Sequence, residues 1–256
     1  MDIVGRGFLA QNLAPIAERH QGVLVAAAGV SAPRSTTPEP FLREIELIAR
    51  LTDRCERTGE KLVFFSTAST GVYSRPGHPG TEEEPVVPAT PYGRHKYALE
   101  QALHTSAADY LILRLGHVVG PGQPDHQLVP ALTAQVRSGT VRLVPQARRD
   151  LIDVTDVITA VDGLLAAGVA RTTVNVATGW AVPVERIVEH IQHRLGLPAE
   201  WSYQSPAPTQ AISTAKLRRL VPCVEAMGFG PDYFRGVLDK YLPVGQPAYG
   251  HAERGE

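Results

Sequence analysis

The regular alternation of short apolar segments with amphipathic segments is the feature that most restricts the fold of this chain. Apolar segments at residues 1–4, 22–28, 62–65, 110–115 and 173–177 read as strands. A glycine-bearing turn at residues 5–10 leads into a predicted helix that ends near His20, and helical spacing or composition predicts further helices at residues 41–58, 91–103, 127–138, 153–167, 184–195 and 231–242. Parallel strands need long crossover connections, so this alternation predicts an α/β fold with a parallel sheet and helices on both faces.

Charge and composition exclude several classes of function. The 25 basic and 26 acidic residues leave a net charge of -1, so there is no basic field for nucleic acid or an anionic membrane. No apolar run approaches the roughly 20 residues that span a bilayer. Cys55 and Cys223 are too few for a disulfide framework, and we expect no metal site. The N-terminal sequence has no secretory pattern, which predicts a cytoplasmic protein.

A glycine-bearing turn joins the first predicted strand to the first helix. Residues 5–10 (GRGFLA) fit a G-x-G-x-x-A pattern, in which small residues let a pyrophosphate approach the backbone. A tight strand-to-helix turn without any ligand has the same pattern, and the motif alone leaves both interpretations open.

Tyr92 and Lys96 are spaced by one helical turn in the segment YGRHK. Side chains at i and i+4 share a helix face, so the phenol and the ammonium can face one cleft. A nearby ammonium favours the phenolate and lowers the pKa of a tyrosine, which suits proton exchange with a hydroxyl or carbonyl. Alone, the pair is suggestive, because such a spacing also arises by chance.

A hydroxyl-rich segment, residues 66–70 (STAST), directly follows the predicted strand at 62–65. The carboxyl ends of parallel strands are where ligand crevices form. One of these hydroxyls would then bond the substrate oxygen that Tyr92 protonates, whereas most of them would cap helices or stabilise turns.

With these motifs in this order, the chain resembles the extended short-chain dehydrogenase/reductase superfamily, of the NAD-dependent epimerase/dehydratase type. The resemblance covers most of residues 1–220 and implies a Rossmann-like fold. It rests on Tyr92 and Lys96 and on the segments GFLA (7–10), LVAAAG (24–29), FSTASTGVY (65–73), RLGHVVGPG (114–122), RDLIDVTD (149–156), VNVATG (174–179) and STAKL (213–217).

The resemblance implies NAD or NADP as cofactor and a small-molecule substrate, a nucleotide sugar. The implied catalytic residues are Tyr92, Lys96 and Ser69. Substrate contacts are implied for Ser69, Thr70, His117, which replaces an asparagine, and Arg149, which would touch a diphosphate. Cofactor contacts are implied for Gly5, Arg6, Gly7, Phe8, Leu9, Ala27, Ala28, Gly29 and Thr67, together with Tyr92 and Lys96.

The chain departs from the family pattern after its first helix. Two strands and a helix that cradle the adenosine usually precede the LVAAAG strand, but here His20 is followed almost at once by Gly22. Residues 22–28 could instead be the second strand of a complete fold. The acidic residue expected about 20 residues after the glycines is absent, however, and the next strand already leads to Ser69. We therefore expect a truncated sheet that lacks the adenosine-side β-α-β unit, with cofactor binding weak or lost.

A second departure from the family pattern reduces the number of reactions that the resemblance implies. Family members that are 4,6-dehydratases carry Asp-Glu after the catalytic hydroxyl, where this chain has Thr70 and Gly71. Ketone reduction, alcohol oxidation and epimerisation through a transient ketone remain. The acidic run at residues 82–84 is expected to be a solvated loop. The alternative function is that of a cofactor-poor relative, which would bind a regulatory ligand or perform non-redox acid/base chemistry in the same cleft.

The resemblance also predicts how the chain is organised. Residues 1–122 and 149–180 are expected to form the truncated Rossmann-like domain, residues 123–148 and 181–250 a small substrate-binding lobe, and residues 251–256 a tail. A homodimer is expected through the helices at 41–58 and 92–103.

Overall fold

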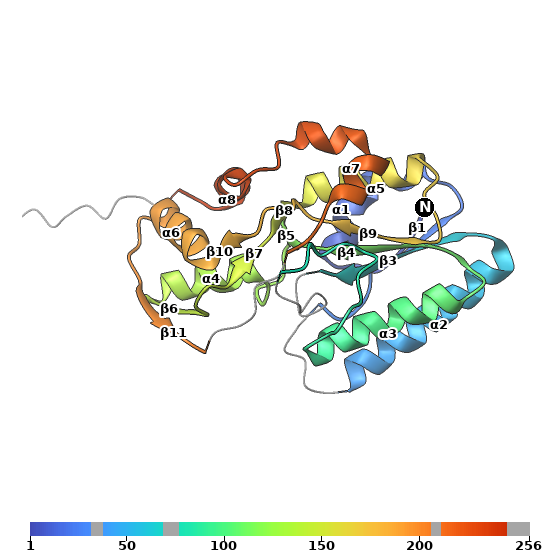
Figure 1. Cartoon of the computed structure of the whole chain (residues 1–256), viewed down its shortest axis with the longest axis horizontal. Helices are drawn as coiled ribbons and strands as arrows, with labels where there is room; N and C mark the ends of the chain where they lie inside the picture. Colours follow the sequence, from blue (N-terminus) through green and yellow to red (C-terminus); the bar gives the residue numbers. More distant parts are fainter. Residues whose placement is uncertain (32–37, 69–76, 206–210, 245–256) are drawn as a thin grey trace, which may run out of the picture.

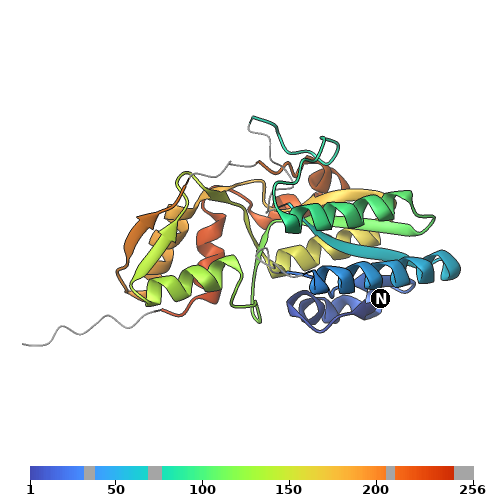
Figure 2. The ribbon, with the colours of Figure 1, turned by 90° about the horizontal axis from the view of Figure 1, so that it is seen from below.

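The computed structural model of the chain describes residues 1–31, 38–68, 77–205 and 211–244. Two lobes lie side by side, a larger one around the main sheet and a smaller one built from helices and short strands (Figures 1 and 2). Ser69 and Thr70, expected to contact the substrate, lie outside the described residues.

The larger lobe contains a five-stranded parallel sheet, which confirms the predicted Rossmann-like class. Its order is β1-β2-β3-β4-β9, with every neighbouring pair parallel. The strands are β1 (Asp2–Val4), β2 (Val23–Ala26), β3 (Lys61–Thr67), β4 (Asp109–Leu115) and β9 (Thr172–Val176). From its second residue on, β3 is buried throughout, as expected for a strand covered on both faces.

Helices cover both faces of this sheet. α1 (Phe8–Leu13) and α5 (Val154–Ala166) lie on one face, and α2 (Glu39–Thr58) and α3 (Pro91–Thr105) lie on the other (Figure 1). The alternation of side chains along β3 produces this division, because Val63 and Phe65 pack with α1 and α5 whereas Leu62 and Phe64 pack with α2 and α3.

β1 is an edge strand, and within the described residues no strand lies beyond it. The steps from β1 to β2 and from β2 to β3 run in one direction along the sheet, but α1 and α2 lie on opposite faces. The two crossovers therefore have opposite hands, although nearly all such connections are right-handed. Loss of an outer β-α-β unit accounts for this exception, since α1 would have the usual hand if it led outward from β1.

The first α-helix ends earlier than predicted, since the sequence indicated a helix that continues to about His20. α1 ends at Leu13 and continues as the 3₁₀ helix η1 (Ala14–Arg19). Pro15 explains the change, because proline has no backbone N–H and its ring disrupts an α-helix interior. Arg19 and His20, which follow, contact Asp162 of α5 at 2.9 and 2.7 Å and hold this connection against the larger lobe.

The smaller lobe has its own apolar core. It comprises α4 (Leu128–Arg137), β6 (Thr140–Leu143), α6 (Val184–Leu195), β11 (Glu200–Tyr203) and α8 (Tyr233–Tyr241), with β6 and β11 paired in parallel. Two elements within residues 181–250 pack elsewhere: α7 (Ala215–Leu220) and the 3₁₀ helix η2 (Pro222–Met227) contribute Leu217 and Val224 to the core of the larger lobe. The packing thus differs from the predicted division, because the chain returns to the main sheet before α8.

Four very short strands connect the lobes. β5 (His117–Val119) pairs with β8 (Leu151–Asp153), and β7 (Arg148–Arg149) pairs with β10 (Val182–Pro183). Strands of two or three residues are too short to produce a recognisable pattern in the sequence. They matter because they carry His117 and Arg149 into the region between the lobes.

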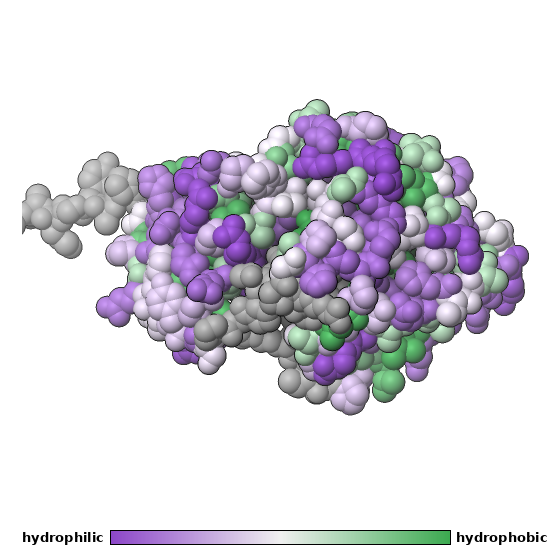
Figure 3. All heavy atoms as spheres, viewed as in Figure 1, coloured by the Kyte–Doolittle hydropathy of each residue, from purple (hydrophilic) through white to green (hydrophobic). Residues whose placement is uncertain are grey.

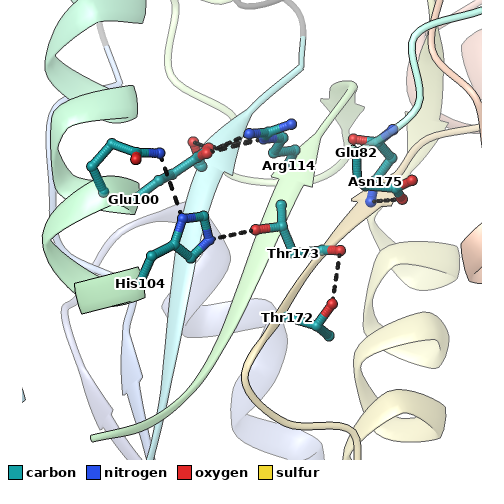
Figure 4. Close-up of polar contacts among 9 residues, drawn as sticks. Glu82, Glu100, His104, Arg114, Thr172, Thr173 and Asn175 are labelled. Atoms are coloured by element: carbon teal, nitrogen blue, oxygen red, sulfur yellow. Dashed lines mark hydrogen bonds and ion pairs between the residues drawn. The ribbon is translucent and has the colours of Figure 1, made fainter. Parts of the chain in front are cut away.

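The acidic run at residues 82–84 is not simply a solvated loop, as the sequence had suggested. Glu82 accepts a hydrogen bond from the backbone N–H of Asn175, at the outer edge of β9 (Figure 4), at 2.8 Å. The buried Asn175 amide donates to the carbonyls of Gly80 and Ser213 at 3.0 and 2.9 Å. These bonds protect an edge strand and hold two distant loops against it.

Candidate active site

A cleft of about 660 Å³ lies at the carboxyl ends of the strands, between the two lobes. Residues that follow β1 and β2 line one wall together with the last residues of β3, α3 contributes a second wall, and α4 and the lobe connections close the far side. The predicted site residues among its lining are Gly7, Phe8, Leu9, Ala27, Ala28, Gly29, Thr67, Tyr92, Lys96, His117 and Arg149. Gly5 and Arg6 are not part of this lining.

The two glycines of the N-terminal turn have different surroundings. Gly5 has a φ of +145°, and a Cβ there would lie 2.6 Å from the Ala27 carbonyl, so it is glycine that lets the turn pack against the end of β2. Gly7 has an ordinary φ of -82°, and apart from its own backbone and its chain neighbours no heavy atom of the described residues lies within 4 Å of the position that a Cβ would take. Gly5 thus serves packing, whereas Gly7 borders open space in the cleft.

Tyr92 reaches the cleft from the first turn of α3. The Thr90 side chain caps this helix by accepting a hydrogen bond from the Gly93 N–H at 3.0 Å. Tyr92 is only 9% exposed and lines the cleft. Burial raises the pKa of the phenol; Lys96 lowers it and Glu44 raises it further, so the net shift is upward. Lys96 thus lowers the pKa of Tyr92 as the sequence predicted, but burial and Glu44 outweigh its effect.

Lys96 is held by groups from two other elements. Its Nζ donates to Glu44 Oε1 at 2.6 Å and to the carbonyl of Phe65 at 3.3 Å. The ammonium also lies 5.1 Å from the centre of the Phe64 ring. Lys96 is therefore fixed at the cleft wall, with its charge partly compensated.

Glu44, in α2, is the site residue that the sequence interpretation missed. It is 3% exposed, lines the cleft, and is buried on the same helix stripe as Ile48 and Leu51. A carboxylate on an otherwise apolar stripe was the available signal. Burial would raise the pKa of Glu44, but the hydrogen bond from His95 and the ion pair with Lys96 hold it below its ordinary value.

His117 and Arg149 face the same cleft from the lobe connections. The buried His117 Nδ1 has no hydrogen-bond partner among the described residues, and burial together with Arg149 lowers the pKa of the imidazole to about 3. Arg149 donates to the carbonyl of Arg148 at 2.8 Å, and burial lowers the pKa of its guanidinium, with no carboxylate among the described residues acting against that effect. A neutral imidazole beside an uncompensated guanidinium suits an anionic group such as a phosphate.

Asp150, the neighbour of Arg149, does not neutralise it. Its buried carboxylate accepts hydrogen bonds from the Thr178 hydroxyl and N–H at 2.8 and 2.9 Å, and from the Gly179 N–H at 2.8 Å. Burial raises the pKa of this carboxyl despite those donors. Because Asp150 turns toward the loop after β9, the positive charge of Arg149 stays available to the cleft.

A buried ion pair joins α3 to strand β4 of the main sheet. Glu100, one turn after Lys96, is fully buried and accepts from Arg114 of β4, with Nη2 at 2.6 Å and Nε at 3.0 Å (Figure 4). The Ser66 hydroxyl also donates to Glu100. Ser66 thus ties β3 to α3, and these contacts fix the side of α3 that carries Tyr92 and Lys96 toward the cleft.

The chain is similar to enzymes that act on nucleotide sugars. The model of the NAD dependent epimerase/dehydratase family matches residues 10–177. The dTDP-6-deoxy-L-talose 4-dehydrogenase (NAD(P)(+)) of Kitasatospora kifunensis is 34% identical over 162 residues, which cover 58% of this chain and 50% of that enzyme. A putative UDP-glucose 4-epimerase of Methanocaldococcus jannaschii is 28% identical over 184 residues, which cover 68% of this chain and 58% of that protein. The chain thus matches only about half to three fifths of these relatives.

A solved structure extends the similarity to the whole fold. RMD from Pseudomonas aeruginosa, complexed with NADPH, superposes with a TM-score of 0.72 at 18% identity. The superposition covers 93% of this chain and 96% of the other. At this identity the likeness concerns the fold alone.

Proposed function

The chain belongs to the NAD dependent epimerase/dehydratase family, and from that premise we propose that it is an NAD(P)-dependent oxidoreductase or epimerase of a nucleotide sugar. The observation that carries the proposal is the arrangement of the cleft: Tyr92 and Lys96 lie on one wall, and His117 and Arg149 border the same space. A 4,6-dehydratase is not proposed, because Thr70 and Gly71 replace the acidic pair.

The residues present fit the nicotinamide end of the cofactor better than its adenosine end. Lys96 uses two of its three N–H donors on Glu44 and Phe65, which leaves one for a ribose hydroxyl. Gly7 borders the space that a pyrophosphate needs. At the adenosine end the described sheet stops at β1. We therefore propose that this chain binds NAD or NADP with reduced affinity; when bound, the nicotinamide supplies hydride chemistry.

The side chains of the cleft have distinct roles in this proposal. The Tyr92 hydroxyl gives a proton to the oxygen of a ketone, or takes one from an alcohol, and Ser69 orients that oxygen. Arg149 and His117 bind the substrate diphosphate, with Thr70 beside the sugar. The smaller lobe holds the nucleotide, because its helix α4 lines the same cleft as Arg149.

We expect isothermal titration to detect binding of NADH or NADPH, and Gly7→Ala to weaken it about tenfold. A methyl group at residue 7 occupies the space proposed for the pyrophosphate, and Gly7 has a φ that alanine adopts without strain. Gly236→Ala is the matched control, because position 236 also has open space but lies in α8, away from the cleft.

Absence of binding at millimolar dinucleotide would instead favour a second candidate, a cofactor-poor relative with non-redox acid/base chemistry or a regulatory ligand. The sheet that stops at β1 is the observation in its favour. Equal binding by wild type and Gly7→Ala would place the dinucleotide elsewhere.

We also propose a homodimer through α2 and α3. Leu42 and Ile45 of α2 are 54% and 45% exposed, and apolar surface gathers near these helices (Figure 3). Light scattering is expected to give the mass of a dimer at micromolar concentration, and Leu42→Glu/Ile45→Glu to give a monomer. Leu197→Glu, an exposed leucine of the smaller lobe, is the control that should remain dimeric. A monomeric wild type would refute this assembly.

The cellular location remains a prediction from the sequence. Both cysteines are free, which is compatible with the proposed cytoplasmic location. In the described part of the chain, no helix combines the length and the apolar character needed to cross a bilayer.

A further inference from the structure

Glu44 is a buried carboxylate at the centre of the proposed site, and the roles described so far leave it unused. Oε1 accepts from Lys96 Nζ at 2.6 Å, and Oε2 accepts from the Val30 N–H at 3.0 Å and from His95 Nε2 at 2.9 Å. An ionised carboxylate only accepts hydrogen bonds, so His95 must donate here through Nε2–H. The carboxylate thus joins α2, α3 and the loop after β2.

The surrounding chain is shaped to admit this carboxylate. A Cβ on Gly29 would lie 2.2 Å from Glu44 Oε1, so any side chain at position 29 would displace the acid. Gly29 does not have a left-handed φ, and close approach is therefore its reason for being glycine. The last residue of the LVAAAG segment makes room for a side chain that also lines the cleft.

Within the described residues, the groups that contact Glu44 and Lys96 come from α3, the loop after β2 and β3. From α3, His95 and Lys96 contact Glu44, and Tyr92 lies one turn before Lys96. The loop after β2 contributes the N–H of Val30, and β3 contributes the Phe65 carbonyl that holds Lys96. Among the charged groups of the described residues, Lys96 lowers the pKa of the Tyr92 phenol and Glu44 raises it.

We propose that Glu44 is a positioning residue for the Tyr92–Lys96 pair, which fixes the Lys96 ammonium and opposes its charge beside the phenol, so that Tyr92 rests as a proton donor. The role follows from geometry: one oxygen of a buried acid holds the ammonium, while the other is anchored by two donors. It rests on the proposed function, because it assumes that Tyr92 exchanges the proton. Glu44 sets the pH at which Tyr92 loses that proton.

The test measures the ionisation of Tyr92 without cofactor or substrate. Nuclear magnetic resonance of protein with ¹³C-labelled tyrosine rings follows each phenol through a pH titration, and the signal lost in Tyr92→Phe identifies Tyr92. Removing the negative charge in Glu44→Gln stabilises the phenolate, so the midpoint of Tyr92 is expected to move to lower pH. Glu46→Gln is the control, because Glu46 is an exposed acid of the same helix and its removal should leave the midpoint unchanged.

A second comparison keeps the test valid if Glu44→Gln does not fold. Lys96→Gln and the double variant Glu44→Gln/Lys96→Gln differ only at position 44. The double variant removes both charges of the buried ion pair, so that no charge is left buried without its partner. The midpoint of Tyr92 is expected to be lower in the double variant than in Lys96→Gln. An unchanged or higher midpoint on loss of Glu44, in the pair of proteins that folds, would overturn the proposal.

The proposed function is judged by other measurements. In an active enzyme, the limb of the pH profile of kcat/KM that reports Tyr92 should move to lower pH in Glu44→Gln, in step with the titration. If the midpoint of Tyr92 shifts in Glu44→Gln while Tyr92→Phe stays fully active, Glu44 controls the ionisation of the phenol but the proposed function is wrong. If the midpoint of Tyr92 is unchanged in Glu44→Gln while Tyr92→Phe is inactive, the proposed function stands and the proposed role of Glu44 is wrong.

Discussion

Replacing Tyr92 by phenylalanine is expected to reduce turnover of the nucleotide sugar about a thousandfold, the usual range for loss of a general acid or base. Phenylalanine keeps the buried ring at the cleft wall and removes only the hydroxyl. The fold should therefore persist while proton transfer fails. Absorbance of the reduced nicotinamide measures oxidation of dTDP-6-deoxy-L-talose. Chromatography of the sugar nucleotides measures epimerisation of UDP-glucose, which produces no net reduced nicotinamide; both substrates are named for relatives.

Tyr97→Phe is the matched control for this experiment. Tyr97 is a half-buried residue of the same helix, and it is not part of the cleft lining. Its turnover should stay within about twofold of wild type, since a tyrosine remote from the reacting atoms exchanges no proton with them. Full activity in Tyr92→Phe, measured with a substrate that wild type converts, would refute the proposed mechanism.

The second large effect concerns stability, since Glu100→Ala should lower the free energy of unfolding by about 3–5 kcal/mol. The change removes the carboxylate that neutralises Arg114, and both side chains are almost completely buried. The cost comes from keeping the guanidinium charge buried without the Glu100 carboxylate beside it. Urea denaturation followed by circular dichroism measures the difference.

Two further variants separate the buried charge from other causes of instability. Glu83→Ala, which breaks an exposed ion pair with Lys216, is expected to cost less than about 1 kcal/mol. Glu100→Leu/Arg114→Leu removes both buried charges and should destabilise less than Glu100→Ala does. A double variant that is clearly the less stable of the two would mean that the hydrogen-bonded geometry, rather than charge neutralisation, is what matters at this position.

The local patterns of the chain were sufficient for the main sheet. Continuous apolar runs predicted β2, β3 and β4 near their observed positions, because a strand buried on both faces needs apolar side chains on both. The helix spacing of Tyr92 and Lys96 was equally informative, since i and i+4 side chains share a face. The shortage of chain after His20 predicted the sheet that stops at β1.

Other features arise from contacts between distant segments. The strands that place His117 and Arg149 are two or three residues long, so pairing partners rather than residue preferences define them. The sequence predicted that Glu82 lies in a solvated loop, whereas its carboxylate accepts a hydrogen bond from a backbone N–H of β9. α7 and η2 followed the smaller lobe in sequence but pack against the larger one.

The sequence by itself determined the class of fold and the presence of a Tyr92–Lys96 pair on one helix face, because both follow from the spacing of neighbouring residues. The tertiary structure decided the electrostatic state of that pair. Glu44 is 52 residues from Lys96 in the chain, yet its carboxylate lies 2.6 Å from the ammonium and is buried with it. Burial and that opposing charge raise the pKa of Tyr92, against the effect of Lys96 alone, because charge interactions depend on distance in space and on exclusion of water.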